Sequence, residues 1–135
     1  MGYALAHAAW QRGADVTLIS GPVDIPVPPG MKRVRIETTE ELQEAVSRSL
    51  SLADVLIMAA APADYKPETT AAHKLKRESG PLSLTLEPTL DVLASTAYWR
   101  RSSAVIVGFA LETQDLVARA RTKLALGRFH HLRIA

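Results

Sequence analysis

The chain of 135 residues contains no cysteine, which excludes a disulfide framework, a thiolate nucleophile and a cysteine-based zinc site. Aromatic residues make up only 5% of the chain and the net charge is +2, so it lacks the stacking surfaces and dense basic patches of nucleic-acid-binding proteins. No apolar run approaches the roughly 20 residues that span a bilayer, and the first residues lack a signal-peptide layout. We expect a cytoplasmic protein with neither a nucleic-acid nor a membrane partner.

Two common nucleotide-binding motifs are also missing. Neither GxGxxG nor GxxxxGK[ST] occurs, so ordinary dinucleotide binding and P-loop chemistry have no sequence support. Doubly wound folds usually begin with a strand and a glycine-rich turn before the first helix, whereas this chain opens in a helical pattern. We expect a sheet that lacks its usual first strand and exposes an unpaired edge or a hole. A fragment, a mis-started reading frame and a divergent relative all remain open.

The pattern that is present alternates strands with helices. This predicts an α/β fold with an open, mostly parallel, Rossmann-like three-layer sheet. Helical spacing is expected over residues 2–12, 39–51, 90–101 and 112–126. Strands are expected over residues 15–20, 34–37, 54–61, 82–86 and 104–110. The segment 82–86 alternates apolar and polar residues, which favours a half-exposed edge strand.

Local signals give the ends and buried faces of two helices. Thr38 and Glu41 form a capping-box pattern, and Thr89 is expected to be an N-cap. The inward faces are predicted to carry Leu42, Ala45, Val46 and Leu50 in one helix, and Leu90, Val92, Leu93, Ala97 and Tyr98 in the other.

The most informative stretch is residues 54–77. An uninterrupted apolar run favours a strand covered on both faces, and it ends in small residues, Ala59 to Ala61, before Pro62. The loop that follows carries a carboxylate and three ammonium groups, on Asp64, Lys66, Lys74 and Lys76. Ligands of open α/β sheets bind at the carboxyl ends of such strands. The stretch therefore indicates an anionic ligand held with a divalent metal; a core strand followed by a solvated loop is the alternative.

Seven segments together resemble a known family. In order they read MGYALA, RGADVTLISGP, ADVLIMAAAPADYKP, HKLKR, PTLDVLA, VGFALET and ARARTKL. They resemble bacterial phosphopantothenoylcysteine synthetase (phosphopantothenate–cysteine ligase), the ligase half of the bifunctional coenzyme A biosynthesis flavoprotein. The resemblance covers residues 1–127 and implies a partial nucleotide-binding ligase-type domain, with residues 128–135 as a divergent or truncated tail.

The resemblance implies a two-step amide synthesis. The carboxylate of 4′-phosphopantothenate would attack CTP to give an acyl-cytidylate, and the amine of cysteine would then displace CMP. CTP and Mg²⁺ are the implied cofactors, and FMN belongs only to the fused decarboxylase partner domain. A homodimer is the assembly implied for full-length members. The choice of CTP over ATP rests on the resemblance alone.

Site residues follow from the resemblance position by position. Asp64 matches an aspartate that contacts the nucleotide and its cation, and Lys74 matches a lysine near the phosphates with the implied catalytic role. The other implied nucleotide contacts are Met58, Ala59, Ala60, Thr89, Leu90, Asp91, Val92, Phe109 and Lys123. Five of these residues also have a structural alternative: a cap for Thr89, a first-turn acid for Asp91, core for Phe109 and solvated charges for Lys74 and Lys123.

Departures from the family pattern affect both ends. The Gly-Thr-rich strand and loop that precede the position of Met1 in the family, and that the resemblance implies for holding phosphate, are not in this sequence. A second family lysine falls on Gly127, with Arg128 as a stand-in. The tail RFHHLRIA lies where a further strand is expected, but His130, His131 and Arg133 interrupt its apolar run. A frameshift near Gly127 is one hypothesis.

Two alternatives remain beside the ligase. One is a non-catalytic remnant that binds nucleotide or pairs with a full-length subunit. The other is an NAD(P)-type Rossmann fragment, which the missing glycine fingerprint disfavours. The four histidines do not predict a zinc site, because His130 and His131 would point apart in a strand.

Overall fold

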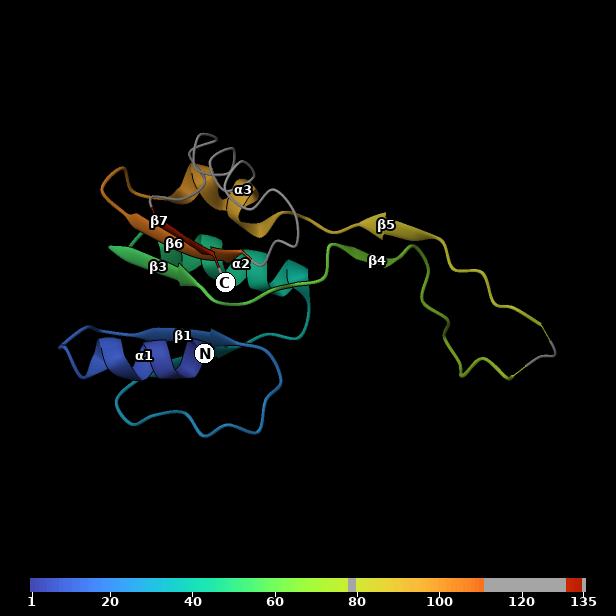
Figure 1. The fold of residues 1–135 in the computed structure, drawn as a ribbon, viewed down its shortest axis with the longest axis horizontal. Helices are drawn as coiled ribbons and strands as arrows, with labels where there is room; N and C mark the ends of the chain where they lie inside the picture. The colour runs from blue at the N-terminus through green and yellow to red at the C-terminus, as the bar shows by residue number, and fades with distance from the viewer. Residues whose placement is uncertain (78–79, 111–130, 135) are drawn as a thin grey trace.

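The computed structural model describes residues 1–77, 80–110 and 131–134. These residues form an α/β body and an arm that projects from it along the long axis of the molecule (Figure 1). We use "arm" for the described residues between Tyr65 and Pro88, and "body" for the rest. Within the described residues, no helix combines the length and the apolar character needed to cross a membrane.

The order of elements confirms the alternation of strands and helices. The helices are α1 (Gly2–Trp10), α2 (Thr39–Leu50), α3 (Val92–Thr96) and the 3₁₀ helix η1 (Ala97–Trp99). The strands are β1 (Thr17–Ser20), β2 (Lys32–Arg35), β3 (Val55–Met58), β4 (Tyr65–Pro67), β5 (Leu86–Pro88), β6 (Val105–Ala110) and β7 (His131–Ile134). The helix predicted over 112–126 lies outside the described residues.

The parallel strands of the body form two separate sheets. β1 pairs with β2, and β3, β6 and β7 form a second sheet in the order β3-β6-β7. Within the described part of the chain, β1 and β3 do not pair with each other, so each keeps one free edge. The unpaired edge expected from the sequence is therefore confirmed, together with the open parallel α/β fold.

The position of β3 corrects one prediction. The run 54–61 suggested a strand covered on both faces, but β3 spans only Val55–Met58, and the side chains of Val55 and Ile57 are 53% and 39% exposed. Among the described residues the strand is unpaired on one side, and the face that carries Leu56 and Met58 packs against the core. Apolar character alone did not reveal which face is covered.

The hydrophobic core lies between α2, α3 and the second sheet. Leu42, Val46 and Leu50 of α2 cluster with Val92 and Ile106. The predicted inward face of α2, including Ala45, is buried as expected. The capping box is also confirmed, because the Glu41 N–H donates to Thr38 Oγ1 at 3.1 Å and the Thr38 N–H donates to Glu41 Oε2 at 3.4 Å.

The predicted second helix is shorter than expected, and its cap is different. The side chain of Asp91, rather than Thr89, accepts from the Ala94 N–H at 2.9 Å, and α3 begins at Val92. Val92 is buried as predicted, but Leu90 and Tyr98 are 50% and 87% exposed. The change to a 3₁₀ helix after Thr96 alters the angular spacing of the side chains, and this turns Tyr98 away from the core. The side chain of Ala97 lies outside the described set.

Two strand predictions are also corrected. The strand expected over 82–86 is instead β5 at Leu86–Pro88, which pairs antiparallel with β4 in a ribbon separate from the parallel sheets. In the tail, residues 131–134 form β7 parallel to β6, although the sequence argued against a regular strand there. Backbone pairing with β6 satisfies this strand whatever the polarity of its side chains.

Candidate functional site at the carboxyl ends of β3 and β6

The end of β3 provides a surface of small residues. Met58 is half-buried and pairs in register with Gly108 of β6, and Ala59 and Ala60 follow directly. The first turn of α1 reaches the same place, since a Cβ built on Gly2 would lie 3.6 Å from the Cβ of Ala59. A ligand at this edge would therefore meet backbone groups with little side-chain obstruction.

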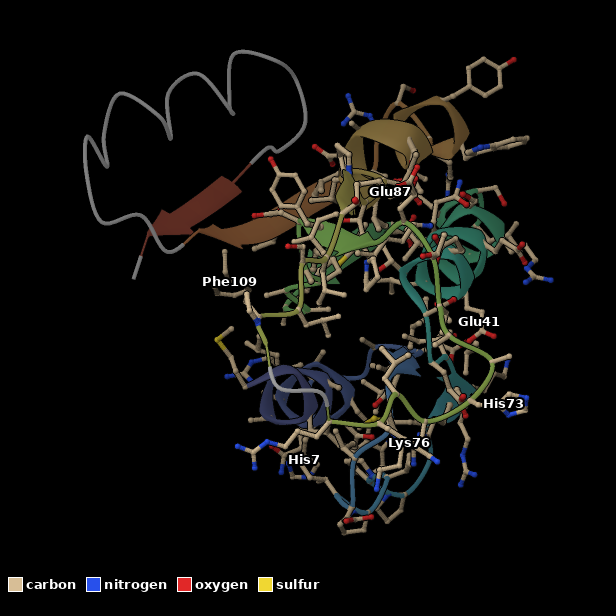
Figure 2. All side chains as sticks on the ribbon, turned by 90° about the vertical axis from the view of Figure 1, so that its right-hand side faces the viewer. His7, Glu41, His73, Lys76, Glu87 and Phe109 are labelled. Carbon is tan, nitrogen blue, oxygen red and sulfur yellow. The ribbon has the colours of Figure 1, made fainter. Side chains whose placement is uncertain are left out.

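Phe109 joins this surface from the neighbouring strand. It follows Gly108 in β6, is half-buried and pairs in register with Arg133 of β7. In Figure 2 the residue labelled Phe109 lies at the end of its strand, well away from the labelled residues of the arm. The structure thus brings Met58 and Phe109 to one edge of the sheet, as parallel pairing requires.

Asp64 and Thr89 are held together where the arm joins the body. The backbone N–H of Thr89 donates to the carbonyl oxygen of Asp64 at 2.8 Å, and the Thr89 hydroxyl donates to the carbonyl oxygen of Ala63. The carboxylate of Asp64 is exposed. These contacts fix the loop that follows β3 against the loop that precedes α3, so two segments predicted to contact the nucleotide are neighbours.

The residues from Thr89 to Val92 have different roles in the structure. Asp91 caps α3, and Val92 belongs to the core cluster, so both have a structural function in this fold. Leu90 is half-exposed beside them.

Lys74 is not brought to this edge. It lies exposed on the loop between β4 and β5, which projects far from the body in Figure 1. His73, directly before Lys74, and Lys76, two residues after it, are labelled on this loop in Figure 2. Lys123, the other predicted lysine, lies outside the described residues.

Lys66 forms ion pairs that attach the arm to the body. Its Nζ lies 2.6 Å from Glu40 Oε1 at the start of α2 and 3.5 Å from Glu87 Oε1 of β5. The hydrogen bond between Lys66 and Glu40 lowers the pKa of the Glu40 carboxyl and raises the pKa of Lys66. Lys66 therefore holds the base of the arm, and no local pattern predicts this, because its partner in α2 is 26 residues away.

Asp64 is the predicted site residue whose side chain could contribute to a metal site. Among the described residues, no group of three or more His, Cys, Asp or Glu side chains could by itself hold a metal. Mg²⁺ commonly uses one or two carboxylates together with substrate phosphates and water. Asp64, exposed at the end of the loop after β3, fits the role of such a single carboxylate.

The sequence missed two contributors to this region. The first turn of α1 contacts Ala59 through Gly2, and strand β4 fixes the base of the arm. A helix directly before the first strand could have suggested the former, because such helices begin at the carboxyl edge of the sheet. The three residues of β4 carry too little pattern to be found.

Comparisons with known proteins show the family and the fold of the chain. Residues 1–131 match the family described as DNA/pantothenate metabolism flavoprotein C-terminal domain. The coenzyme A biosynthesis bifunctional protein CoaBC of Vibrio vulnificus is 43% identical over 126 residues, which cover 92% of this chain and 31% of that protein. The chain therefore spans about a third of the length of this curated relative.

Solved structures show the same fold. The crystal structure of the C-terminal domain of a coenzyme A biosynthesis bifunctional protein CoaBC superposes with a TM-score of 0.82 at 30% identity, covering 98% of this chain and 62% of that one. The DNA/pantothenate metabolism flavoprotein from Streptococcus pneumoniae gives a TM-score of 0.81 at 19% identity, covering 98% and 69% respectively, and shows the fold alone. The chain belongs to the family described as DNA/pantothenate metabolism flavoprotein C-terminal domain.

Proposed function

We propose that this chain contributes the nucleotide site of a phosphopantothenate–cysteine ligase of coenzyme A biosynthesis. One observation carries the proposal. The small residues after β3 and Phe109 of β6 lie at the carboxyl edge of the sheet, where open α/β folds bind ligands, and the loop that leaves this edge leads to Asp64, which is held against Thr89. Membership of the family supports the same conclusion.

The proposed reaction makes an amide in two steps. A carboxylate oxygen of 4′-phosphopantothenate attacks the α-phosphorus of CTP, and the bond from that phosphorus to the β-phosphate bridge breaks to release pyrophosphate. The amine of cysteine then attacks the acyl carbon and CMP leaves. Activation is needed because a free carboxylate does not react with amines, and cationic groups near the phosphates offset the negative charge that develops.

Each residue of the proposed site would have a role that suits the chemistry of its side chain. Ala59 and Ala60 leave the backbone accessible for the nucleotide, and Phe109 offers an apolar ring beside it. Asp64 would hold Mg²⁺, which would supply positive charge to offset the negative charge of the phosphates. Lys74 and Lys123 would contact the phosphates. For Lys74 this requires the arm to bend toward the edge or to reach a second copy of the chain.

The position of Lys74 also favours a second candidate function. Without Lys74 near the edge, the surface formed by Met58 to Ala60 and Phe109 retains small and aromatic contacts for a nucleoside but lacks a described lysine for the triphosphate. Such a surface would bind nucleotide without activating a carboxylate. A protein that binds CTP and yields no pyrophosphate with 4′-phosphopantothenate would fit this second candidate.

Calorimetric titration with CTP and Mg²⁺ tests the proposal, with ATP as the competing nucleotide. We expect CTP to bind more tightly than ATP, and Lys74→Ala to weaken CTP binding about tenfold or more, as expected for loss of a charge-assisted contact. Lys76→Ala is the matched control, since Lys76 lies two residues away on the same exposed loop. A folded chain that binds neither nucleotide would refute the proposed site.

A further inference from the structure

The ribbon formed by β4 and β5 is fixed to the start of α2 by the ammonium group of Lys66. Its Nζ lies 2.6 Å from Glu40 Oε1 of α2 and 3.5 Å from Glu87 Oε1 of β5. Lys66 and Glu87 stand opposite each other in the ribbon, so their side chains leave the same face. One ammonium group therefore contacts a carboxylate of the body and a carboxylate of the arm at the same time.

Glu40 gives this ion pair a rigid attachment point. It lies in the first turn of α2, whose N-terminus is held by the capping box of Thr38 and Glu41. The same helix packs in the hydrophobic core through Leu42 and Val46. A change in the contact between Lys66 and Glu40 would therefore move the ribbon rather than the helix.

The two carboxylates would repel each other without the ammonium group. Glu40 and Glu87 both lie within ion-pair distance of Lys66 Nζ, so they are close together. Like charges at short separation raise the energy of the attached position. An uncharged residue at position 66 would thus remove the attraction to Glu40 and also push the ribbon away from α2.

The distance from this attachment to Lys74 amplifies small movements of the ribbon. The roughly eight residues from Lys66 to Lys74 span at most about 28 Å when extended. Over such a span, a tilt of about 20° at the base would displace Lys74 by up to roughly 10 Å. A lysine contacts a phosphate oxygen only at hydrogen-bond distance, so the orientation of the base decides which positions are useful to Lys74.

We propose that Lys66 is a positioning residue for nucleotide binding, because it holds the ribbon on Glu40 and thereby restricts the positions that Lys74 can occupy. Lys66 acts through Lys74 and does not itself contact the nucleotide. This inference rests on the proposed nucleotide site. Ordering a flexible segment on binding lowers affinity, so an arm whose base is already oriented binds phosphate more tightly.

Calorimetric titration of the full chain with CTP and Mg²⁺ tests this role. Lys66→Met should weaken CTP binding about threefold, the size expected from an exposed ion pair. Lys66→Arg keeps a cation at this position and should bind CTP as the original chain does. In a Lys74→Ala background, Lys66→Met should cause no further loss, because the residue through which it acts is already absent.

Arg48→Gln is the matched control, since Arg48 forms an exposed ion pair with Glu44 and both belong to α2. It should leave CTP binding unchanged. Relaxation of ¹⁵N nuclei in the ligand-free chain reports on the arm itself. The order parameters of residues 82–87 should fall in Lys66→Met and stay unchanged in Lys66→Arg and Arg48→Gln, and a dispersed spectrum will show that each variant is folded.

The two proposals fail in different ways. Unchanged CTP affinity in Lys66→Met, an equal loss in the presence and absence of Lys74, or unchanged order parameters of the arm would overturn the role of Lys66 and leave the nucleotide site intact. A folded original chain that binds no CTP would refute the nucleotide site, and the positioning role would fall with it.

Discussion

The body and the arm use apolar residues in opposite ways. In the body, apolar residues of α2, α3 and β6 close around one buried cluster that includes Val46 and Ile106. In the arm, no described residue is buried, and Leu82, Leu84 and Leu86 are all more than half exposed. The body is therefore stabilised by its own core, whereas the arm depends on β4–β5 pairing and on the ion pairs of Lys66.

The largest expected difference comes from removing side-chain volume. Ile106→Ala should lower the free energy of unfolding by about 2–5 kcal/mol, because the side chain is almost fully buried and its loss leaves a cavity. Leu84→Ala in the arm should change it by less than about 0.5 kcal/mol, since this side chain is exposed. Urea denaturation followed by circular dichroism measures both values. Equal losses in the two variants would contradict the distinction between body and arm.

Two glycines provide a smaller test of the same comparison. Gly30 has φ +80°, and a Cβ there would lie 2.6 Å from Nε1 of Trp10. Gly30→Ala should therefore cost at least about 1–2 kcal/mol of stability, from left-handed backbone strain and contact with the indole ring. Thermal unfolding monitored by tryptophan fluorescence provides the measurement.

Gly80→Ala in the arm is its control. No atom of the described residues outside Gly80 and its chain neighbours lies within 4 Å of a Cβ built at Gly80, so we expect an alanine to be accommodated there. We expect no loss of stability for this variant. A loss equal to that of Gly30→Ala would show that the arm is packed more tightly than its exposure indicates.

The smallest expected effect concerns the ion pair between Lys66 and Glu40, which links the arm to the body. Lys66→Met should return the pKa of Glu40 toward its ordinary value, because the hydrogen bond that lowers it is lost. Carboxyl carbon shifts of Glu40 followed against pH by nuclear magnetic resonance measure this directly. An unchanged Glu40 titration in Lys66→Met would show that the ion pair does not form in solution.

The pH dependence of this link follows from the two pKa shifts. Since the pKa of Glu40 is lowered, its contribution is present above the ordinary carboxyl pKa and is lost as pH falls through the folded-state value. Since the pKa of Lys66 is raised, its contribution is present below the ordinary lysine pKa and is lost as pH rises through the folded-state value. The attachment should thus be complete around neutral pH and weaken at both extremes. The effect on stability should be slight, because both groups are exposed.

Sequence patterns predicted the helices and the core of the body well, because the apolar residues in these patterns are buried in the fold. The capping box at Thr38 and the apolar face of α2 follow local rules that the tertiary fold does not override. The same reasoning failed for Tyr98, where a 3₁₀ turn changed the helical spacing, and for the alternating residues 82–86, which suggested a half-buried strand. A period of two in the sequence does not say whether anything covers the apolar face.

The candidate site was predicted in part. Carboxyl-end residues such as Met58 and Phe109 lie on adjacent strands because parallel order brings distant segments together, and this order could be inferred from the alternation of elements. The distance of Lys74 from that edge could not be inferred, since it depends on the β4–β5 ribbon, which the sequence did not reveal. The environment of Arg33 was also missed, because nothing in the sequence shows that its Nε atom is buried without a hydrogen-bond partner among the described residues.

Hydrogen–deuterium exchange with and without CTP and Mg²⁺ tests the central claim most directly, namely that the nucleotide binds at the carboxyl edge of β3 and β6 and engages the arm. We expect slower exchange in peptides covering residues 58–64 and 105–110, and in the arm loop 68–77. Lys74→Ala should remove the protection of the loop and leave some protection at the strand ends. CTP binding with no change at these segments would contradict the proposed site and require the nucleotide to bind elsewhere on the chain.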